Sequence, residues 1–254
     1  MLGLPLLTGC AIDKGTALAA DFEERWAGTP DVARIRTTKN NTLPFSGTST
    51  GTLVLEDGTS ADRVTKLAGE MREYVARHKK ITGRLTADGL TFTVVADEGR
   101  TGEVLALWRS LKADEQVTVA DIHDAPWKEA TDRWRIEVNT VDATGALAVF
   151  KDMYAEGGRH RPLNGVTVLE VRGPGLFVET GFNDRYPTEA VAAYEAVLAR
   201  HPVVGANLRR DAVSGSAVSI VVAKSADLDD ARELARRAAP NLGAAVEVTS
   251  SSGD

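Results

Sequence analysis

The chain has 254 residues, 43% of them hydrophobic, which is enough for one large domain or two to three small ones. Its formal net charge is −6 and its basic residues are scattered, so the sequence does not indicate the positive patch that a nucleic-acid backbone needs, and nucleic acid is not an expected partner. Cys10 is the only cysteine, which excludes an internal disulfide and a thiolate metal site; no cofactor and no metal are expected.

The first ten residues, MLGLPLLTGC, carry a short pattern ending at that cysteine. Leu7, Thr8, Gly9 and Cys10 resemble the lipobox of bacterial lipoproteins, and the Ala-, Val- and Arg-rich composition suits an actinobacterial type. The resemblance implies that a diacylglyceryl group, with acyl chains such as palmitate, is attached to Cys10. Cleavage of the signal peptide then leaves the lipidated cysteine as the mature N-terminus.

This interpretation divides the start of the chain into a signal-peptide remnant, residues 1–9, and a lipidated tether, residues 10–16. No Lys or Arg precedes Cys10, which departs from the family pattern, and a structural cysteine near the N-terminus is the alternative. No stretch approaches the roughly 20 apolar residues of a membrane-spanning helix. Attachment to the cell membrane is therefore expected through the lipid, with the folded part on the extracytoplasmic face.

Six segments show the apolar periodicity of amphipathic helices. In the clearest, residues 60–78, Val64, Leu67, Met71 and Val75 fall on one stripe. The other five are marked by Leu18, Phe22 and Trp26; Val104, Leu107, Trp108 and Leu111; Leu147, Phe150 and Tyr154; Val191, Tyr194 and Leu198; and Leu228, Ala231, Leu234 and Ala238.

Paired strands are predicted between the helices. LTFTVV at residues 90–95 and RWRIEVN at residues 133–139 alternate apolar and polar side chains, which indicates a sheet covered by helices on one face only. Turn residues within Thr86–Thr91 and Arg172–Phe177 predict tight hairpins. A doubly wound parallel fold is disfavoured.

Strand starts at Leu90, Trp134, Leu176 and Val218 recur roughly every 42 residues, which indicates a repeated unit. The unit is a helix followed by two strands. Because one unit cannot bury its own apolar faces, two are expected to combine as a ferredoxin-like, split βαβ arrangement. The predicted fold is α+β, with tandem ferredoxin-like subdomains whose antiparallel sheets carry helices on one face.

Three such subdomains fit the chain: residues 17–88, lacking the first strand, then residues 89–172 and residues 173–249. Residues 250–254 form a polar tail that is predicted to be disordered. A division shifted by half a unit, which pairs the two ends of the chain, is the alternative.

Two short patterns resemble catalytic or metal sites. Ser49 lies in GTSTG, which matches the G-x-S-x-G elbow of α/β hydrolases, but a strand follows it and we interpret Ser49 as a hairpin-loop serine. Asp121, His123 and Asp124 are three potential metal ligands close together in the sequence, but on a strand Asp124 would point away from the other two. A loop start explains them without a metal.

The other histidines follow arginines at the predicted ends of helices, as Arg77-His78, Arg159-His160 and Arg200-His201. A structural role at the negative end of the helix dipole accounts for them. The alternative hypothesis is that the repeat brings these Arg-His pairs onto neighbouring loops, where they form a basic strip that binds anionic lipid headgroups or wall polymers.

The tryptophans are also candidate contacts. Trp26, Trp108 and Trp134 lie on apolar stripes and are predicted to belong to the core, whereas Trp127 is a candidate exposed contact.

The favoured function is a membrane-anchored lipoprotein that acts as a binding or scaffolding module of the cell envelope, since repeated units provide broad surfaces. An envelope protein, a wall polymer or a small ligand is the expected partner. The alternatives are an envelope hydrolase with a site between subdomains and an accessory subunit of a membrane complex.

Overall fold

The structure is a computed structural model that describes residues 14–43, 46–124, 133–155, 158–161, 163–180, 185–213 and 216–251. Cys10, the other lipobox residues, Trp127 and the last three residues of the predicted tail lie outside the described residues.

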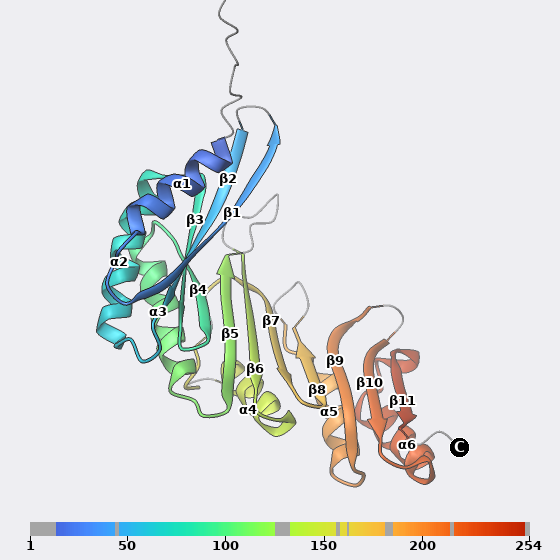
Figure 1. The fold of residues 1–254 in the computed structure, drawn as a ribbon. Coiled ribbons are helices and arrows are strands. Elements are labelled where there is room, and N and C mark those ends of the chain that lie inside the picture. Colours follow the sequence, from blue (N-terminus) through green and yellow to red (C-terminus); the bar gives the residue numbers. More distant parts are fainter. Residues whose placement is uncertain are drawn as a thin grey trace, which may run out of the picture. The chain divides into compact units, whose positions relative to one another are not determined.

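Within the described residues, six helices and eleven strands follow one another as repeats of a helix and two strands (Figure 1). All six predicted helices are confirmed. The elements are α1 Lys14–Trp26, β1 Val32–Leu43, β2 Ser46–Leu55, α2 Ala61–Arg77, β3 Ile81–Ala87, β4 Leu90–Val94, α3 Glu98–Lys112, β5 Val117–Asp124, β6 Trp134–Thr140, α4 Ala143–Tyr154, β7 Val166–Gly173, β8 Leu176–Glu179, α5 Thr188–Leu198, β9 Val203–Val213, β10 Ser216–Val222, α6 Leu228–Ala238 and β11 Val246–Ser250.

The strands are ordered in an 11-stranded sheet as they are in the chain, from β1 to β11. Strands joined by a short turn or loop are antiparallel, as in β1 with β2 and β7 with β8. Strands joined by a helix are parallel neighbours, as in β2 with β3, β6 with β7, β8 with β9 and β10 with β11. Each of these helices is therefore a crossover between adjacent strands.

This mixed α/β architecture is consistent with the predicted α+β class, but the prediction of antiparallel sheets is wrong. The tandem ferredoxin-like subdomains are not confirmed either. A split βαβ unit leaves another strand between the two strands that its helix joins, whereas β6 pairs directly with β7 across α4. The division at residues 88 and 172 stays a prediction.

Two compact units can be distinguished. The first comprises the chain up to Asp88 together with Phe92–Glu103, and the second comprises Gly89–Thr91 and the chain from Val104 onward. The predicted tight hairpins are confirmed: Asp88 and Gly89, with φ of 50° and 80°, join β3 to β4, and Gly175, with φ of 81°, lies between β7 and β8. These left-handed positions match the twist of the strands that they connect.

The core of the first unit lies where α1 and α2 meet β2 and β3. Phe22, Trp26 and Tyr74 form an aromatic cluster, with ring centroids of Phe22 and Tyr74 5.7 Å apart. Gly51 of β2 and Gly83 of β3 are register partners. A Cβ atom on Gly51 would lie 2.4 Å from the Phe22 ring, so the missing side chain is what lets α1 approach the sheet.

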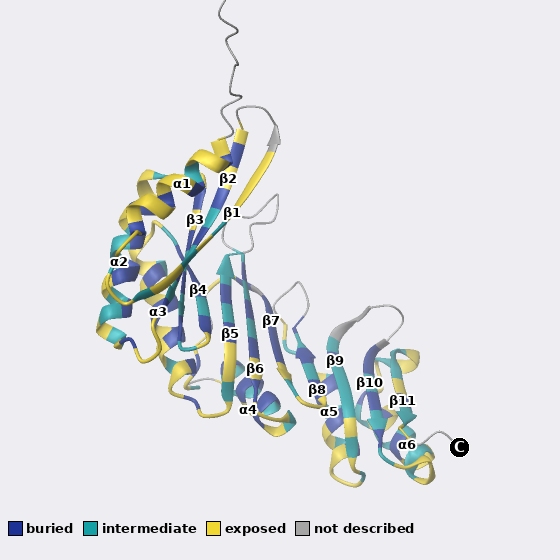
Figure 2. Cartoon of the chain, viewed as in Figure 1, coloured by how far each residue is buried: buried dark blue, intermediate teal, exposed yellow. Residues whose placement is uncertain are grey.

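In the second unit, register places one apolar row across consecutive strands. Each member is at least 98% buried, and the row consists of Ala120, Val138, Val171, Val178, Leu208 and Val218. Helices α5 and α6 pack on one another as well as on β9 and β11. Buried and intermediate segments alternate along β6 and β8, as Figure 2 shows. On each strand, the residues immediately before and after the member of this row therefore point to the opposite face of the sheet.

The close approach at Gly51 gives a testable prediction. Gly51→Ala forces the Phe22 ring out of its position, and we expect it to lower the free energy of unfolding by about 1–3 kcal/mol. Gly69→Ala is the matched control, because Gly69 lies within α2 and nothing lies within 4 Å of its missing Cβ atom. It should raise the free energy of unfolding by about 0.5–1 kcal/mol. Urea denaturation measures both; equal effects would contradict this account of α1 packing.

Candidate functional site

A network of connected ion pairs lies on the second unit's sheet face opposite the apolar row. We call it the Arg–Glu lattice, and it consists of Arg135, Glu137, Glu170, Arg172, Glu179 and Arg209. The lattice spans β6, β7, β8 and β9, and the strand register aligns its members.

Three carboxylates of the lattice stand side by side. Register pairs Glu137 with Glu170 and Glu170 with Glu179, so like charges face one another on three neighbouring strands. Arg135 resolves this repulsion: its guanidinium lies 2.5 Å from both Glu137 and Glu170 and 4.0 Å from Glu179. Because the Glu170 side chain is only 2% exposed, loss of Arg135 would leave a buried charge with one remaining cation, Arg172.

The same contacts affect the ionisation of Arg135. Burial acts to lower its pKa, but the hydrogen bond to Glu137 and the charges of Glu170 and Glu137 outweigh burial and raise the pKa above its usual value. Arg135 therefore stays cationic and holds the three carboxylates together.

An aromatic ring lies between two cations at the β7–β9 side of the lattice. The guanidinium carbons of Arg172 and Arg209 lie 4.9 Å and 5.1 Å from the centroid of the Phe177 ring. Arg209 Nε also donates to Asn207 Oδ1 at 3.2 Å and lies 3.5 Å from Glu179. Arg172 is the more open of the two, with 57% of its side chain exposed. This combination of a half-buried aromatic ring and guanidinium groups is typical of protein-binding surfaces.

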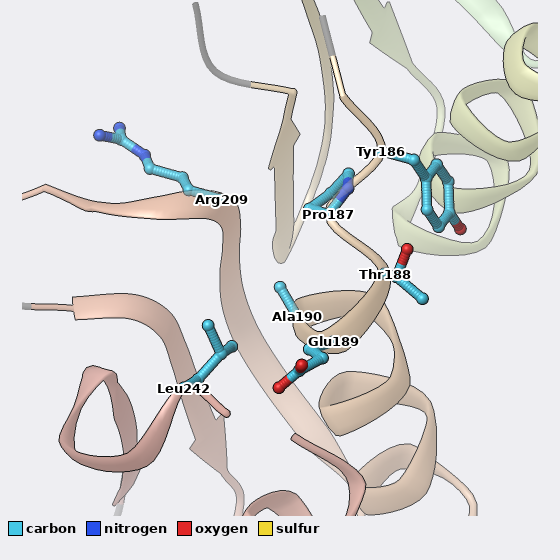
Figure 3. Close-up of a pocket in the computed structure, with 7 residues that line it drawn as sticks. All are labelled: Tyr186, Pro187, Thr188, Glu189, Ala190, Arg209 and Leu242. Atoms are coloured by element: carbon cyan, nitrogen blue, oxygen red, sulfur yellow. The ribbon is translucent and has the colours of Figure 1, made fainter. Parts of the chain in front are cut away.

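A pocket of about 220 Å³ adjoins the lattice at Arg209 (Figure 3). Its walls come from the start of α5, from β9 and from Leu242. Both carboxylate oxygens of Glu189 already accept hydrogen bonds from Asn241. Burial, and then the charge of Glu195, raise the pKa of Tyr186, so its phenol stays neutral. The volume is below the roughly 300–1,000 Å³ of small-molecule sites and suits one inserted side chain.

Asp121 and His123 lie at the margin of this face, on β5. Register places Asp121 beside Glu137 and His123 beside Arg135, while Asp124 is the partner of buried Trp134. His123 Nε2 is 3.9 Å from Glu137 Oε1. No group of three or more His, Cys, Asp or Glu residues within the described ranges is arranged to hold a metal ion.

His160 occupies a buried cluster that the sequence did not predict. Its Nε2 lies 2.8 Å from Asp114 Oδ2 and its Nδ1 lies 3.1 Å from Ser110 Oγ, with the histidine 1% exposed. Ser110 Oγ donates to the carbonyl of Leu107, and Asp114 also accepts from Arg159 at 2.8 Å. Ser110, His160 and Asp114 are the residue types of a hydrolase triad. Their hydrogen bonds join the end of α3 to the segment after α4, which gives the cluster a structural role.

The other Arg-His pairs differ in environment. His201 lies 2.7 Å from Asp230 and 3.6 Å from Asp227, and Arg200 lies 3.8 Å from Asp230. His78 is the C-cap of α2, as the helix-dipole interpretation predicts, and its ring stacks on Tyr74. Each of the three pairs has a carboxylate neighbour, namely Asp21, Asp114 and Asp230, and the single basic strip stays a prediction.

The remaining sequence candidates have structural roles. Ser49 lies within β2 rather than in a loop, is 2% exposed and donates to the carbonyl of Thr38 at 2.9 Å. Trp26, Trp108 and Trp134 are at least 98% buried, which confirms their assignment to the core.

Comparison with known proteins adds no family: no protein-family model matches the chain, and neither the curated proteins nor the solved structures give a significant match. In the described part of the chain, no helix is long and apolar enough to cross a membrane.

The sequence analysis missed the lattice and the Asp114 cluster for different reasons. The alternation RWRIEVN places Arg135 and Glu137 on the polar strand face, but only the pairing of β6 with β7, and of β7 with β8, brings Glu170 and Glu179 to them. For Asp114, the Arg159-His160 pair was a usable signal. The sequence analysis interpreted the pair as the end of a helix, whereas His160 lies beyond the end of α4 and contacts a carboxylate that is remote in sequence.

The buried Asp114 carboxylate gives a pH-dependent prediction. Burial acts to raise its pKa, but hydrogen bonds from the Gln116 amide and from His160, with the charge of Arg159, lower it below the usual value. A depressed folded-state pKa stabilises the fold above about pH 4, and this stabilisation is lost as the pH falls through the folded-state pKa.

Asp114→Asn should therefore reduce the free energy of unfolding at pH 7 by about 3 kcal/mol, because His160 and Arg159 lose their anionic partner. The difference from the parent protein should shrink below about pH 4, where the unfolded-state carboxylate takes up a proton. Glu115→Gln, at the neighbouring exposed position, is the control and should change stability by less than about 0.5 kcal/mol. Equal losses in the two variants would refute the role assigned to Asp114.

Proposed function

We propose that the protein is a lipid-anchored, extracytoplasmic lipoprotein that works as a binding or scaffolding module in the cell envelope. The anchor is the diacylglyceryl group that the lipobox Leu7, Thr8 and Gly9 assigns to Cys10. Two acyl chains are sufficient for stable membrane attachment. The repeated helix–strand–strand unit then supplies a broad surface outside the bilayer.

The observation that carries the binding role is the placement of Phe177 between Arg172 and Arg209 on the face opposite the apolar row. Aromatic and arginine side chains dominate the binding energy of protein interfaces, whereas a face that only contacts water has no need of a half-buried phenylalanine. The pocket beside Arg209 offers room for one further side chain from the partner.

The chemistry of this face favours another envelope protein over a small ligand. All three arginines already contact carboxylates, Arg172 through Glu170, but 57% of the Arg172 side chain is open to solvent and can contact a second carboxylate. A partner segment that places an apolar or aromatic side chain over Phe177 and a carboxylate beside Arg172 fits this arrangement. Such an interaction needs no displacement of the buried Glu170 contacts.

Lipid attachment is tested by mass spectrometry of the native protein and by Cys10→Ala. We expect the native chain to begin at Cys10 with its acyl groups and to enter the detergent phase of a membrane extract. The variant should remain uncut and move to the aqueous phase. An unmodified thiol on an uncut native chain would contradict the anchor.

The binding face is tested by Phe177→Ala during copurification from detergent-solubilised membranes. We expect association with the native partner to weaken by about 30-fold or more, the loss of a hot-spot side chain of about 2 kcal/mol. Val119→Ala on β5, where the parent side chain is 46% exposed, is the control and should leave association unchanged. Equal retention of the partner by both variants, with matched melting temperatures, would place the binding surface elsewhere.

A further inference from the structure

A second cavity lies in the first unit, between the start of α1 and the end of α2. Its volume is about 510 Å³. The polar side chains that line it are five basic residues and one acidic residue: Lys14, Arg77, His78, Lys79, Lys80 and Asp21. The lining of this cavity is therefore positively charged, although the net charge of the whole protein is −6.

The carboxylate in the cavity is already occupied. Asp21 Oδ2 accepts a hydrogen bond from the Tyr74 hydroxyl at 2.6 Å and lies 3.8 Å from His78 Nδ1. Burial, and then this hydrogen bond, raise the pKa of Tyr74, so the phenol keeps its proton and remains the donor. Asp21 is therefore committed to the wall of the cavity and does not neutralise the lysines.

Lys14, Arg77, Lys79 and Lys80 are exposed, and none of them makes an ion pair with another described residue. Elsewhere in the described chain, comparable cations are paired, as Arg159 is with Asp114 and Arg200 with Asp230. Four cations around one cavity repel one another, and a multivalent anion relieves that repulsion.

The position of Lys14 relates this cavity to the membrane. Lys14 lines the cavity and lies four residues after Cys10. Because an extended residue advances at most about 3.6 Å, Lys14 is within roughly 14 Å of the Cys10 backbone whatever the path between them. Given the lipid anchor of the proposed function, on which this step rests, the cavity is close enough to the anchor to reach the phospholipid headgroups.

We propose that the cavity binds the phosphate group of an anionic phospholipid headgroup. Lysine and arginine side chains supply the charge for the phosphate, and the apolar residues Ala17 and Leu18 in the same wall can contact the glycerol and upper acyl carbons. Such a contact would orient the first unit on the bilayer, which a flexible acyl tether alone does not do.

The test uses the full chain carrying Cys10→Ala, so that binding does not depend on lipidation. Sedimentation with vesicles of phosphatidylcholine and phosphatidylglycerol (3:1) should show binding that vesicles of phosphatidylcholine alone do not. Lys79→Ala with Lys80→Ala should weaken binding by about 25-fold, or about fivefold per cation removed near an anionic surface.

Lys224→Ala with Arg236→Ala is the matched control, since it removes the same charge from two exposed positions of the second unit. It should change vesicle binding by less than twofold. Equal losses in the two double variants would show a response to net charge alone and overturn the proposal.

Soluble glycerol phosphate separates a lipid from a free phosphate ligand. If it perturbs the lysine NMR signals at micromolar concentration while anionic vesicles bind no better than neutral ones, the ligand is a free phosphate ester and the lipid assignment is wrong. Failure of the lipid anchor itself appears separately, as an unmodified Cys10 in the native protein.

Discussion

The alignment of strands is the constraint on which the second unit depends. Once register places Val138, Val171 and Val178 in one buried row beneath the helices, the alternation of strand residues fixes what the other face presents. Glu137, Glu170 and Glu179 become neighbours because they flank these residues in the sequence. A slip of one residue would turn the carboxylates toward the helices and the valines toward the opposite face.

The three carboxylates show how such a surface is kept stable. Side by side they are repulsive, and Arg135 removes the repulsion by contacting all three. Phe177 lies on β8 beside this cluster, where Arg172 and Arg209 flank its half-buried ring. The charged groups of the lattice are paired with one another, whereas the Phe177 ring is half-buried and has apolar surface left for a partner. We therefore assign the binding role to the ring.

Sequence periodicity predicted the six helices, the hairpins at Gly89 and Gly175 and the repeated helix–strand–strand unit, because each depends on residues close together in the chain. It did not predict how the strands on either side of a helix pair. Alternation in RWRIEVN indicates one covered face equally well for parallel and antiparallel partners, so it does not distinguish a split arrangement from the direct pairing of β6 with β7. The His160–Asp114 contact was out of reach for the same reason, since 46 residues separate the two.

Strand order within each unit also bears on how the chain acquires its structure. Every described strand partner is the preceding or the following strand, so no pairing awaits a distant part of the polypeptide. Folding rate rises as contacting residues become closer along the chain. A polypeptide that emerges amino end first can complete each hairpin and crossover in turn, and it leaves little unpaired backbone exposed while the rest is still arriving.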